Sequence, residues 1–254
     1  MQIQALLLDN TTGPWHKIYQ EGSLKTWCTR LSNSSNTILY RGQDPKLKIL
    51  NILLNRILIR NSIQKYWPLI QVRKNSSQVK CLLSEGELKV AIPELWPNIT
   101  LKTLTAIRFI HEFKDYEVLV RANASCYLNI SALEKYLNEN PSEFLYGGPK
   151  LESKKFISGW GIIMNRPVIE ILLRNENVQY FKYYDDEAIG LILNEVGISP
   201  QPIPFLAIES ISQLLTINVE VLKSTPLIRV KSFQRGTRSD HKIMKLIHQM
   251  IGES

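Results

Sequence analysis

Residues Val90–Leu137 read VAIPELWPNITLKTLTAIRFIHEFKDYEVLVRANASCYLNISALEKYL, and this stretch decides the fold. Its pattern predicts a short strand, a turn at Pro93, an amphipathic helix, a second buried strand at Val118–Val120 and another helix. A polar break, Asn123-Ala124-Ser125, separates that second strand from the last helix. Strands that alternate with helices in this way are typical of a mainly parallel sheet covered by helices.

The rest of the chain continues the alternation in both directions. Further strands are predicted at Ile3–Leu8, Thr37–Tyr40, Val79–Leu83, Leu88–Ile92 and Phe144–Tyr146. Helices are predicted at 46–65, after caps at Thr100 and Ser131, from Pro167 to Leu173, at Asp185–Val196 and at His241–Ile251. We therefore predict an α/β fold with one Rossmann-like, mainly parallel sheet. Without an evident linker or repeat, residues 1–254 are predicted to form one domain, in which 201–254 is the least clearly assigned part.

The charge of the chain limits its partners. A formal net charge of +8 over 254 residues suits an anionic partner, such as a nucleotide, a nucleic acid or an acidic membrane surface. The basic residues are scattered except in 231–245, so a solvated surface explains them equally well. Since no nucleic-acid motif is present, we do not predict nucleic-acid binding, while peripheral membrane contact stays open.

Targeting signals and cysteine usage indicate a compartment. The N-terminal apolar run is short and lacks a basic segment before it, and no stretch approaches the ~20 apolar residues of a membrane span. Three cysteines without metal-ligand spacing suit a reducing environment. We expect a soluble, cytoplasmic protein without a transmembrane segment.

Four short motifs occur in a fixed order along the chain. They are Leu24–Trp27 followed by Ile38–Gly42, then Asn98–Thr103 (NITLKT), Phe156–Met164 (FISGWGIIM) and Asp185–Gly190 (DDEAIG). Taken together they resemble the IRxTW and FLLG, NLTxKT, CSGGGYVLS and EDVxxG elements of the β1,3-galactosyltransferase and fringe group, glycosyltransferase family 31. The resemblance covers roughly residues 3 to 200, and NITLKT is its most specific match.

The resemblance implies a GT-A fold and a glycosyltransferase. It implies a nucleotide-sugar donor, expected to be a UDP-sugar, and transfer to a hydroxyl of a glycan acceptor with inversion at the anomeric carbon. Such a transfer needs a base for the acceptor proton. By resemblance that base is Asp186, with Asp185 orienting it or touching the acceptor. Without the resemblance, acidic residues in the first turn of a helix are explained by the helix dipole alone.

The family's metal-binding triplet is altered in this chain. The family holds a divalent ion with an acidic DDD or DxD, and the aligned positions here are Asn123, Ala124 and Ser125. Mg²⁺ and Mn²⁺ sites normally use one or two carboxylates, so we expect metal binding to be weak or absent. If a metal is bound, the oxygens of Asn123 and Ser125 are its candidate ligands.

Basic side chains offer another way to hold a diphosphate. The candidates are Lys102, Arg121, Lys231, Arg235 and Arg238. For each of them, ordinary surface charge is the competing interpretation.

Two more segments are candidates for substrate contacts. In the resembling family the segment aligned with Ser158-Gly159-Trp160-Gly161 lies beside the donor sugar and acceptor, where glycine allows close approach and Trp160 could stack on a sugar. A tight turn with a core tryptophan fits the same residues. Asp9, Asn10 and Thr11 follow the first strand, where α/β folds usually receive a nucleotide.

Two functions are compatible with these features. The first is an active inverting glycosyltransferase that needs little or no metal. The second is a catalytically inactive nucleotide-sugar or glycan-binding module on the same fold, suggested by the missing acidic triplet. A third, nucleic-acid binding through the basic tail, has no motif to support it.

Overall fold

The computed structural model describes residues 1–9, 14–31, 36–43, 74–151, 154–232 and 238–252. The helix predicted at 46–65 lies outside these ranges. Within them, no helix is both long enough and apolar enough to cross a membrane.

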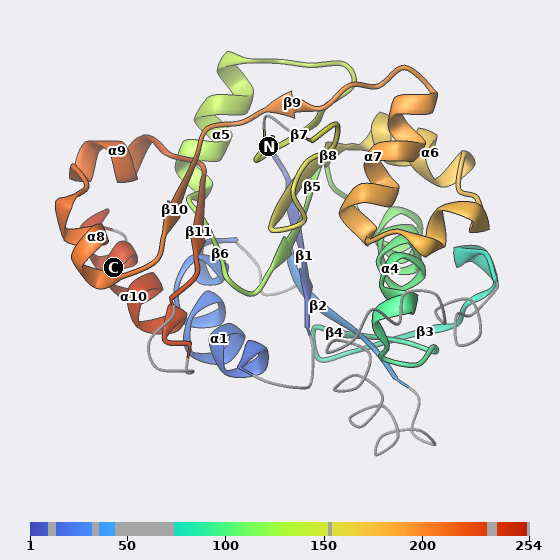
Figure 1. Cartoon of the computed structure of the whole chain (residues 1–254), viewed down its shortest axis with the longest axis horizontal. Helices are drawn as coiled ribbons and strands as arrows, with labels where there is room; N and C mark the ends of the chain where they lie inside the picture. The colour runs from blue at the N-terminus through green and yellow to red at the C-terminus, as the bar shows by residue number, and fades with distance from the viewer. Residues whose placement is uncertain (10–13, 32–35, 44–73, 152–153, 233–237, 253–254) are drawn as a thin grey trace.

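The central sheet has eight strands in the described residues, in the order β3-β4-β2-β1-β5-β8-β7-β9. The strands are β1 Ile3–Leu8, β2 Thr37–Gly42, β3 Cys81–Ser84, β4 Glu87–Val90, β5 Val118–Asn123, β7 Tyr146–Gly148, β8 Gly161–Asn165 and β9 Gln201–Pro202. Parallel pairs join β4, β2, β1 and β5, while β8 is antiparallel to both of its neighbours. The predicted α/β fold with a mainly parallel sheet flanked by helices is confirmed (Figure 1).

One face of this sheet is covered by three helices. They are α4 (Ile99–Phe113), α6 (Arg166–Arg174) and α7 (Asp185–Glu195). Leu6, Ile38 and Leu119 point to this side and form a buried cluster with apolar residues of the three helices. The next residue along each strand points to the other face of the sheet, because successive side chains of a strand alternate between the two faces.

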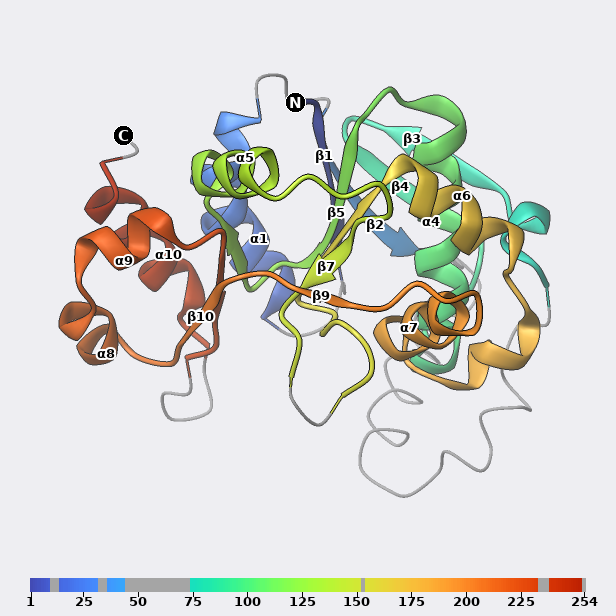
Figure 2. The ribbon, with the colours of Figure 1, turned by 90° about the horizontal axis from the view of Figure 1, so that it is seen from above.

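The opposite face packs against a second group of elements. It carries α1 (Trp15–Glu21), α5 (Ile130–Glu139) and α10 (Asp240–Met250), with Leu7, Leu39 and Val120 in the shared core. A small sheet belongs to this layer, in the order β10-β11-β6, made of Phe205–Ile208, Leu227–Val230 and Cys126–Leu128. The short helices α8 (Ile211–Thr216) and α9 (Val219–Ser224) lie beyond it. Figure 2 shows the two groups of helices on opposite sides of the central sheet.

The carboxyl ends of the parallel strands bring the candidate residues to one edge. Leu8 at the end of β1 pairs with Tyr40 on one side and with Asn123 on the other. The polar break Asn123-Ala124-Ser125 therefore turns the chain from β5 in the central sheet to β6 in the small sheet. This edge is where ligands bind in open α/β sheets.

Most predicted elements are present, but two predicted caps are wrong. The helix α5 begins at Ile130, and the Asn129 side chain, not Ser131, caps it by accepting from the Ala132 N–H at 3.2 Å. The helix α4 begins at Ile99, before Thr100, whose hydroxyl instead donates to the Tyr183 carbonyl at 2.7 Å. A local cap two residues earlier thus sets the start of α5, while a tertiary contact occupies the hydroxyl of Thr100.

Candidate functional site

A buried ion pair lies at the centre of the candidate site. Arg121 follows Leu119 by two positions in β5, so it points to the α4 and α7 face of the sheet. There its guanidinium pairs with the Asp185 carboxylate at the start of α7, and both side chains are 4% exposed or less. Burial is the largest effect on the pKa of Arg121 and lowers it, but the Asp185 charge, the Tyr40 hydroxyl and the Asp186 charge together outweigh burial, so the pKa is raised. The guanidinium is therefore held in its charged form.

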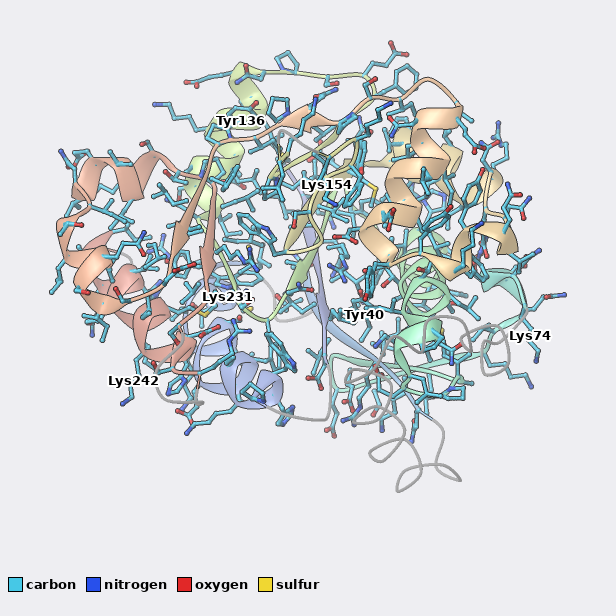
Figure 3. All side chains as sticks on the ribbon, viewed as in Figure 1. Tyr40, Lys74, Tyr136, Lys154, Lys231 and Lys242 are labelled. Atoms are coloured by element: carbon cyan, nitrogen blue, oxygen red, sulfur yellow. The ribbon has the colours of Figure 1, made fainter. Side chains whose placement is uncertain are left out.

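A hydrogen-bond network fixes the geometry of this ion pair. The Asp185 Oδ2 accepts from the Thr103 hydroxyl at 2.7 Å, and Thr103 Oγ1 lies 2.9 Å from the Tyr40 hydroxyl. Arg121 Nε donates to the same Tyr40 oxygen at 3.1 Å. Figure 3 shows Tyr40 between the sheet and α4. Three elements are thus tied to α7 through one buried polar cluster.

Asp186 lies on the open side of this cluster. Its Oδ2 accepts from the Gly159 N–H at 2.9 Å and its Oδ1 from the Glu187 N–H at 2.9 Å. Gly159 also links it to Arg121, because the Gly159 carbonyl accepts from the Arg121 guanidinium. The side chain is partly exposed, whereas that of Asp185 is buried. Backbone N–H groups thus fix the Asp186 carboxylate in position, while part of the side chain stays exposed to solvent.

The surroundings of Asp186 raise the pKa of its carboxyl above the ordinary 3.8. Burial contributes most and the neighbouring Asp185 charge adds to it, while the Gly159 N–H, Arg121 and the Glu187 N–H oppose both. A carboxylate with a raised pKa is a stronger proton acceptor than a free aspartate. Two adjacent carboxylates with different environments are a common arrangement for acid–base chemistry.

Gly159 lies where any larger residue would be too close to neighbouring atoms. A Cβ atom there would lie 2.9 Å from Arg121 Nη1 and 3.1 Å from Asp186 Oδ2. The residue is part of a turn in which Gly161 N donates to the Ser158 carbonyl at 3.2 Å. Glycine at 159 therefore allows the turn to approach both charged groups closely.

Trp160 in the same turn is a core residue. It is 4% exposed, its ring is 5.2 Å from that of Phe205, and the Arg229 guanidinium lies 5.6 Å from its centroid. Its indole N–H is buried and has no partner in the described part of the chain. Stacking of a sugar on Trp160 would require Phe205 or Arg229 to move. The predicted contacts of Ser158–Gly161 with a sugar stay predictions.

The polar break lies next to Arg121. Asn123 accepts from Arg121 Nη1 at 3.1 Å through its side-chain oxygen, and Ser125 is buried. Across the residues that the structure describes, no group of three or more His, Cys, Asp or Glu side chains is arranged to hold a metal ion. The Asn123 side-chain oxygen, which stands where the resembling family has a carboxylate, thus already accepts a hydrogen bond from Arg121.

Lys102 is also engaged internally. Its ammonium pairs with Glu94, and the two side chains are 4% and 14% exposed. The other Glu94 oxygen accepts from the Gly42 N–H at the end of β2. Lys102 lies in the NITLKT segment, as does Thr103, so this segment connects α4 to both β2 and α7. A phosphate could recruit Lys102 only by competing with Glu94.

Asp9 is a buried carboxylate without hydrogen-bond donors. Its side chain is fully buried, and neither oxygen has a hydrogen-bond partner within the described ranges. The nearest basic side chain is His16, whose Nδ1 is 3.6 Å from Oδ2. Burial raises the pKa of Asp9, against the effect of His16 and Arg41 and with that of Glu94. The predicted donor contacts of Asp9 stay predictions, and Asn10 and Thr11 lie outside the described residues.

A pocket of about 710 Å³ lies over β2 and β4 on the α1 face of the sheet, and its lining includes His16, the neighbour of Asp9. Its polar lining includes His16, Arg41, Glu87 and Lys89. Arg41 and Glu87 form an ion pair of 2.6 Å. This pocket is separated by the sheet from Asp186, so the two features cannot be one binding site for a small group.

The basic residues of the C-terminal segment that were predicted to bind the donor differ in their contacts and burial. Arg238 pairs with the buried Asp240 and stacks 4.3 Å from the Trp15 ring centroid. Lys231 is partly buried beyond the end of β11 (Figure 3). Arg235 lies outside the described residues. Arg238 is thus a structural residue in this arrangement.

Four residues that shape this region were not predicted from the sequence. Tyr40 and Glu94 are isolated polar residues in apolar segments, and Thr103 was noticed only as a letter of a motif. Arg229 lies in a four-residue strand that was not predicted. Tyr40 and Arg229 could have been found in the sequence as a hydroxyl-bearing and a charged residue within otherwise apolar strand segments.

No protein-family profile matches the chain, and no curated protein matches it in sequence. Among solved structures, it is similar to a glycosyltransferase involved in the glycosylation of the major capsid of PBCV-1, with a TM-score of 0.44 and 8% identity. That match covers 96% of this chain and 98% of the other. At these values it assigns neither a family nor an activity.

Proposed function

We propose that this protein is an inverting glycosyltransferase of GT-A type that transfers a sugar from a nucleotide sugar, in the first instance a UDP-sugar, to a hydroxyl of a glycan. The observation that carries the proposal is the Asp186 carboxylate, which is partly exposed beside Arg121 and Gly159 and has a raised pKa. Asp186 is the residue to which the family resemblance gives the role of base.

The proposed reaction uses Asp186 as the general base. Its carboxylate takes the proton of the acceptor hydroxyl while the acceptor oxygen bonds to the anomeric carbon of the donor sugar. The bond from that carbon to the phosphate oxygen breaks, and the nucleoside diphosphate leaves. Each Asp186 oxygen accepts one backbone N–H and keeps a lone pair for this proton. Asp185 is the positioning residue, because its contacts with Arg121 and Thr103 fix the start of α7.

Metal dependence is proposed to be weak or absent. The charge that a metal would supply to the leaving diphosphate has to come from basic groups if the neutral Asn123 and Ser125 replace the acidic triplet. Mn²⁺ or Mg²⁺ carried by the donor phosphates would add to binding only slightly.

A thermal-shift panel tests both the donor and the metal. UDP-, GDP- and dTDP-sugars are each added in Mn²⁺ or in EDTA, and a ligand that binds the folded state raises the melting temperature. We expect a UDP-sugar to raise it, by nearly the same amount in both conditions, and transfer to fall only slightly in EDTA. A shift seen only with Mn²⁺ would show that a metal site survives, and no shift with any donor would refute the proposed substrate class.

The raised pKa of Asp186 predicts a particular pH dependence. The base is active when ionised, so kcat/KM should fall as the pH decreases through the pKa of Asp186, at a pH above the ordinary 3.8 of aspartate. The measurement is kcat/KM across the acid range, with circular dichroism at each pH to show that the fold is intact. Constant activity down to the ordinary aspartate value would argue against Asp186 as the base.

A further inference from the structure

Arg229 is a cation whose charge is not balanced locally. It lies in β11, where its cross-strand neighbours are Ala207 on β10 and Cys126 on β6. Within the described ranges it forms no ion pair within 4.0 Å, although Glu209 and Asp240 act on it at longer range. Among the described residues its side chain contacts the ring of Trp160, 5.6 Å from the guanidinium carbon, and no carboxylate within 4.0 Å. A partly buried guanidinium without a nearby acid would be stabilised by an anionic ligand.

The position of Arg229 places it beside the polar break. The next residue, Val230, donates its N–H to the Ser125 carbonyl at 2.8 Å. Trp160, on which Arg229 stacks, directly follows Gly159, the residue that contacts both Arg121 and Asp186. Arg229 therefore contacts the 158–161 turn through Trp160 and lies next to the segment that lacks the acidic triplet.

Three other basic groups of the region are neutralised by protein carboxylates. Arg121 is paired with Asp185, Lys102 with Glu94 and Arg238 with Asp240. Burial lowers the pKa of Arg229, and the charge of Arg238 lowers it further. An incoming anion would relieve both effects, whereas it would have to disrupt an existing pair to use any of the other three.

We infer that Arg229 binds the diphosphate of the nucleotide sugar and supplies the positive charge that a divalent ion would otherwise provide. The inference rests on the proposed function for the identity of the ligand. The planar guanidinium suits a phosphate because it can donate two parallel hydrogen bonds, and it also packs near the indole ring of Trp160. The neutral Asn123 and Ser125 then fit a site in which a fixed cation, not a bound metal, faces the phosphates.

The test measures binding of inorganic pyrophosphate and of UDP by calorimetry, in EDTA and at one ionic strength. The wild type is compared with Arg229→Gln, Arg229→Lys and Arg166→Gln. Arg166 is the matched control, because its guanidinium also stacks on an aromatic ring, at 5.1 Å from the Tyr116 centroid. We expect Arg229→Gln to weaken both ligands roughly 10- to 100-fold, Arg229→Lys to weaken them less, and Arg166→Gln to leave them unchanged. Melting temperatures of all variants show whether the fold is retained.

The outcomes separate this inference from the proposed function. Unchanged affinity in a folded Arg229→Gln variant, or no binding of either probe by the wild type, would overturn the inference even if sugar transfer is observed. Conversely, Arg229-dependent binding without transfer of any sugar would leave Arg229 as an anion-binding residue and refute the enzymatic proposal. Asp186→Asn should keep pyrophosphate binding, since it alters the base and not the cation.

Discussion

Asp186→Asn is expected to reduce kcat for sugar transfer by about 10²–10⁴-fold, which makes transfer undetectable in an ordinary assay. The amide cannot take the acceptor proton at neutral pH. It keeps the size of the carboxylate and an oxygen that accepts from the Gly159 N–H, so the turn at 158–161 should stay in place. Donor affinity should therefore change little. Initial rates and donor binding are measured on the same preparation.

Glu187→Gln is the matched control for this variant. Glu187 is in the same first turn of α7 and is also partly exposed, but only its backbone N–H contacts Asp186. We expect nearly normal transfer. Near wild-type turnover in Asp186→Asn would exclude Asp186 as the base. If instead the wild type binds a nucleotide sugar without transferring it, and Asp186→Asn binds it equally, the binding-module hypothesis is supported.

Arg121→Leu is expected to lower the free energy of unfolding by about 3–5 kcal/mol. The substitution leaves the Asp185 carboxylate buried without its cation, although the Thr103 hydroxyl still donates to it, and an unpaired buried charge is strongly destabilising. It also removes the donors to Tyr40 and to the Gly159 carbonyl. Urea denaturation of both proteins gives the difference.

Two further variants show whether the lost stability of Arg121→Leu comes from the buried ion pair. Lys135→Ala breaks an exposed ion pair, Lys135–Glu139 at 3.9 Å, and should cost about 0.5 kcal/mol or less. A double variant, Arg121→Met with Asp185→Leu, removes both buried charges and should recover part of the stability that Arg121→Leu loses. If Arg121→Leu costs no more than Lys135→Ala, the buried pair does not hold α7 on the sheet.

Regular elements of the central sheet could be predicted because their patterns are local. The strand Ile3–Leu8 was predicted at its observed bounds, since all six residues are consecutive in one strand and nearly all are buried. The helix Asp185–Val196 was predicted within one residue of its end, because an acidic first turn and Gly197 define its limits. The position of the polar break at the end of β5 followed from the same reasoning.

The small sheet could not be predicted, because its strands are short and its pairing is long-range. The strand β11 has four residues and pairs with β6, about 100 residues earlier in the chain. No local period marks such a pair, and the cation at its centre was therefore overlooked. Likewise, spacing along the chain could not show that Arg121 and Lys102 are neutralised by Asp185 and Glu94. These partners become neighbours only when the helices pack on the sheet.

The pairing of β6 with β11 has a consequence for synthesis on the ribosome. The strand β6 follows the polar break, yet among the described strands its only partner is β11, at Leu227–Val230. The terminal helix α10 in turn meets α1 through the His241–Glu21 contact at 3.5 Å. A nascent chain of 200 residues can thus build much of the large sheet but still lacks the strand that pairs with β6. The segment after the polar break can therefore reach its final pairing only once Leu227–Val230 has been synthesised.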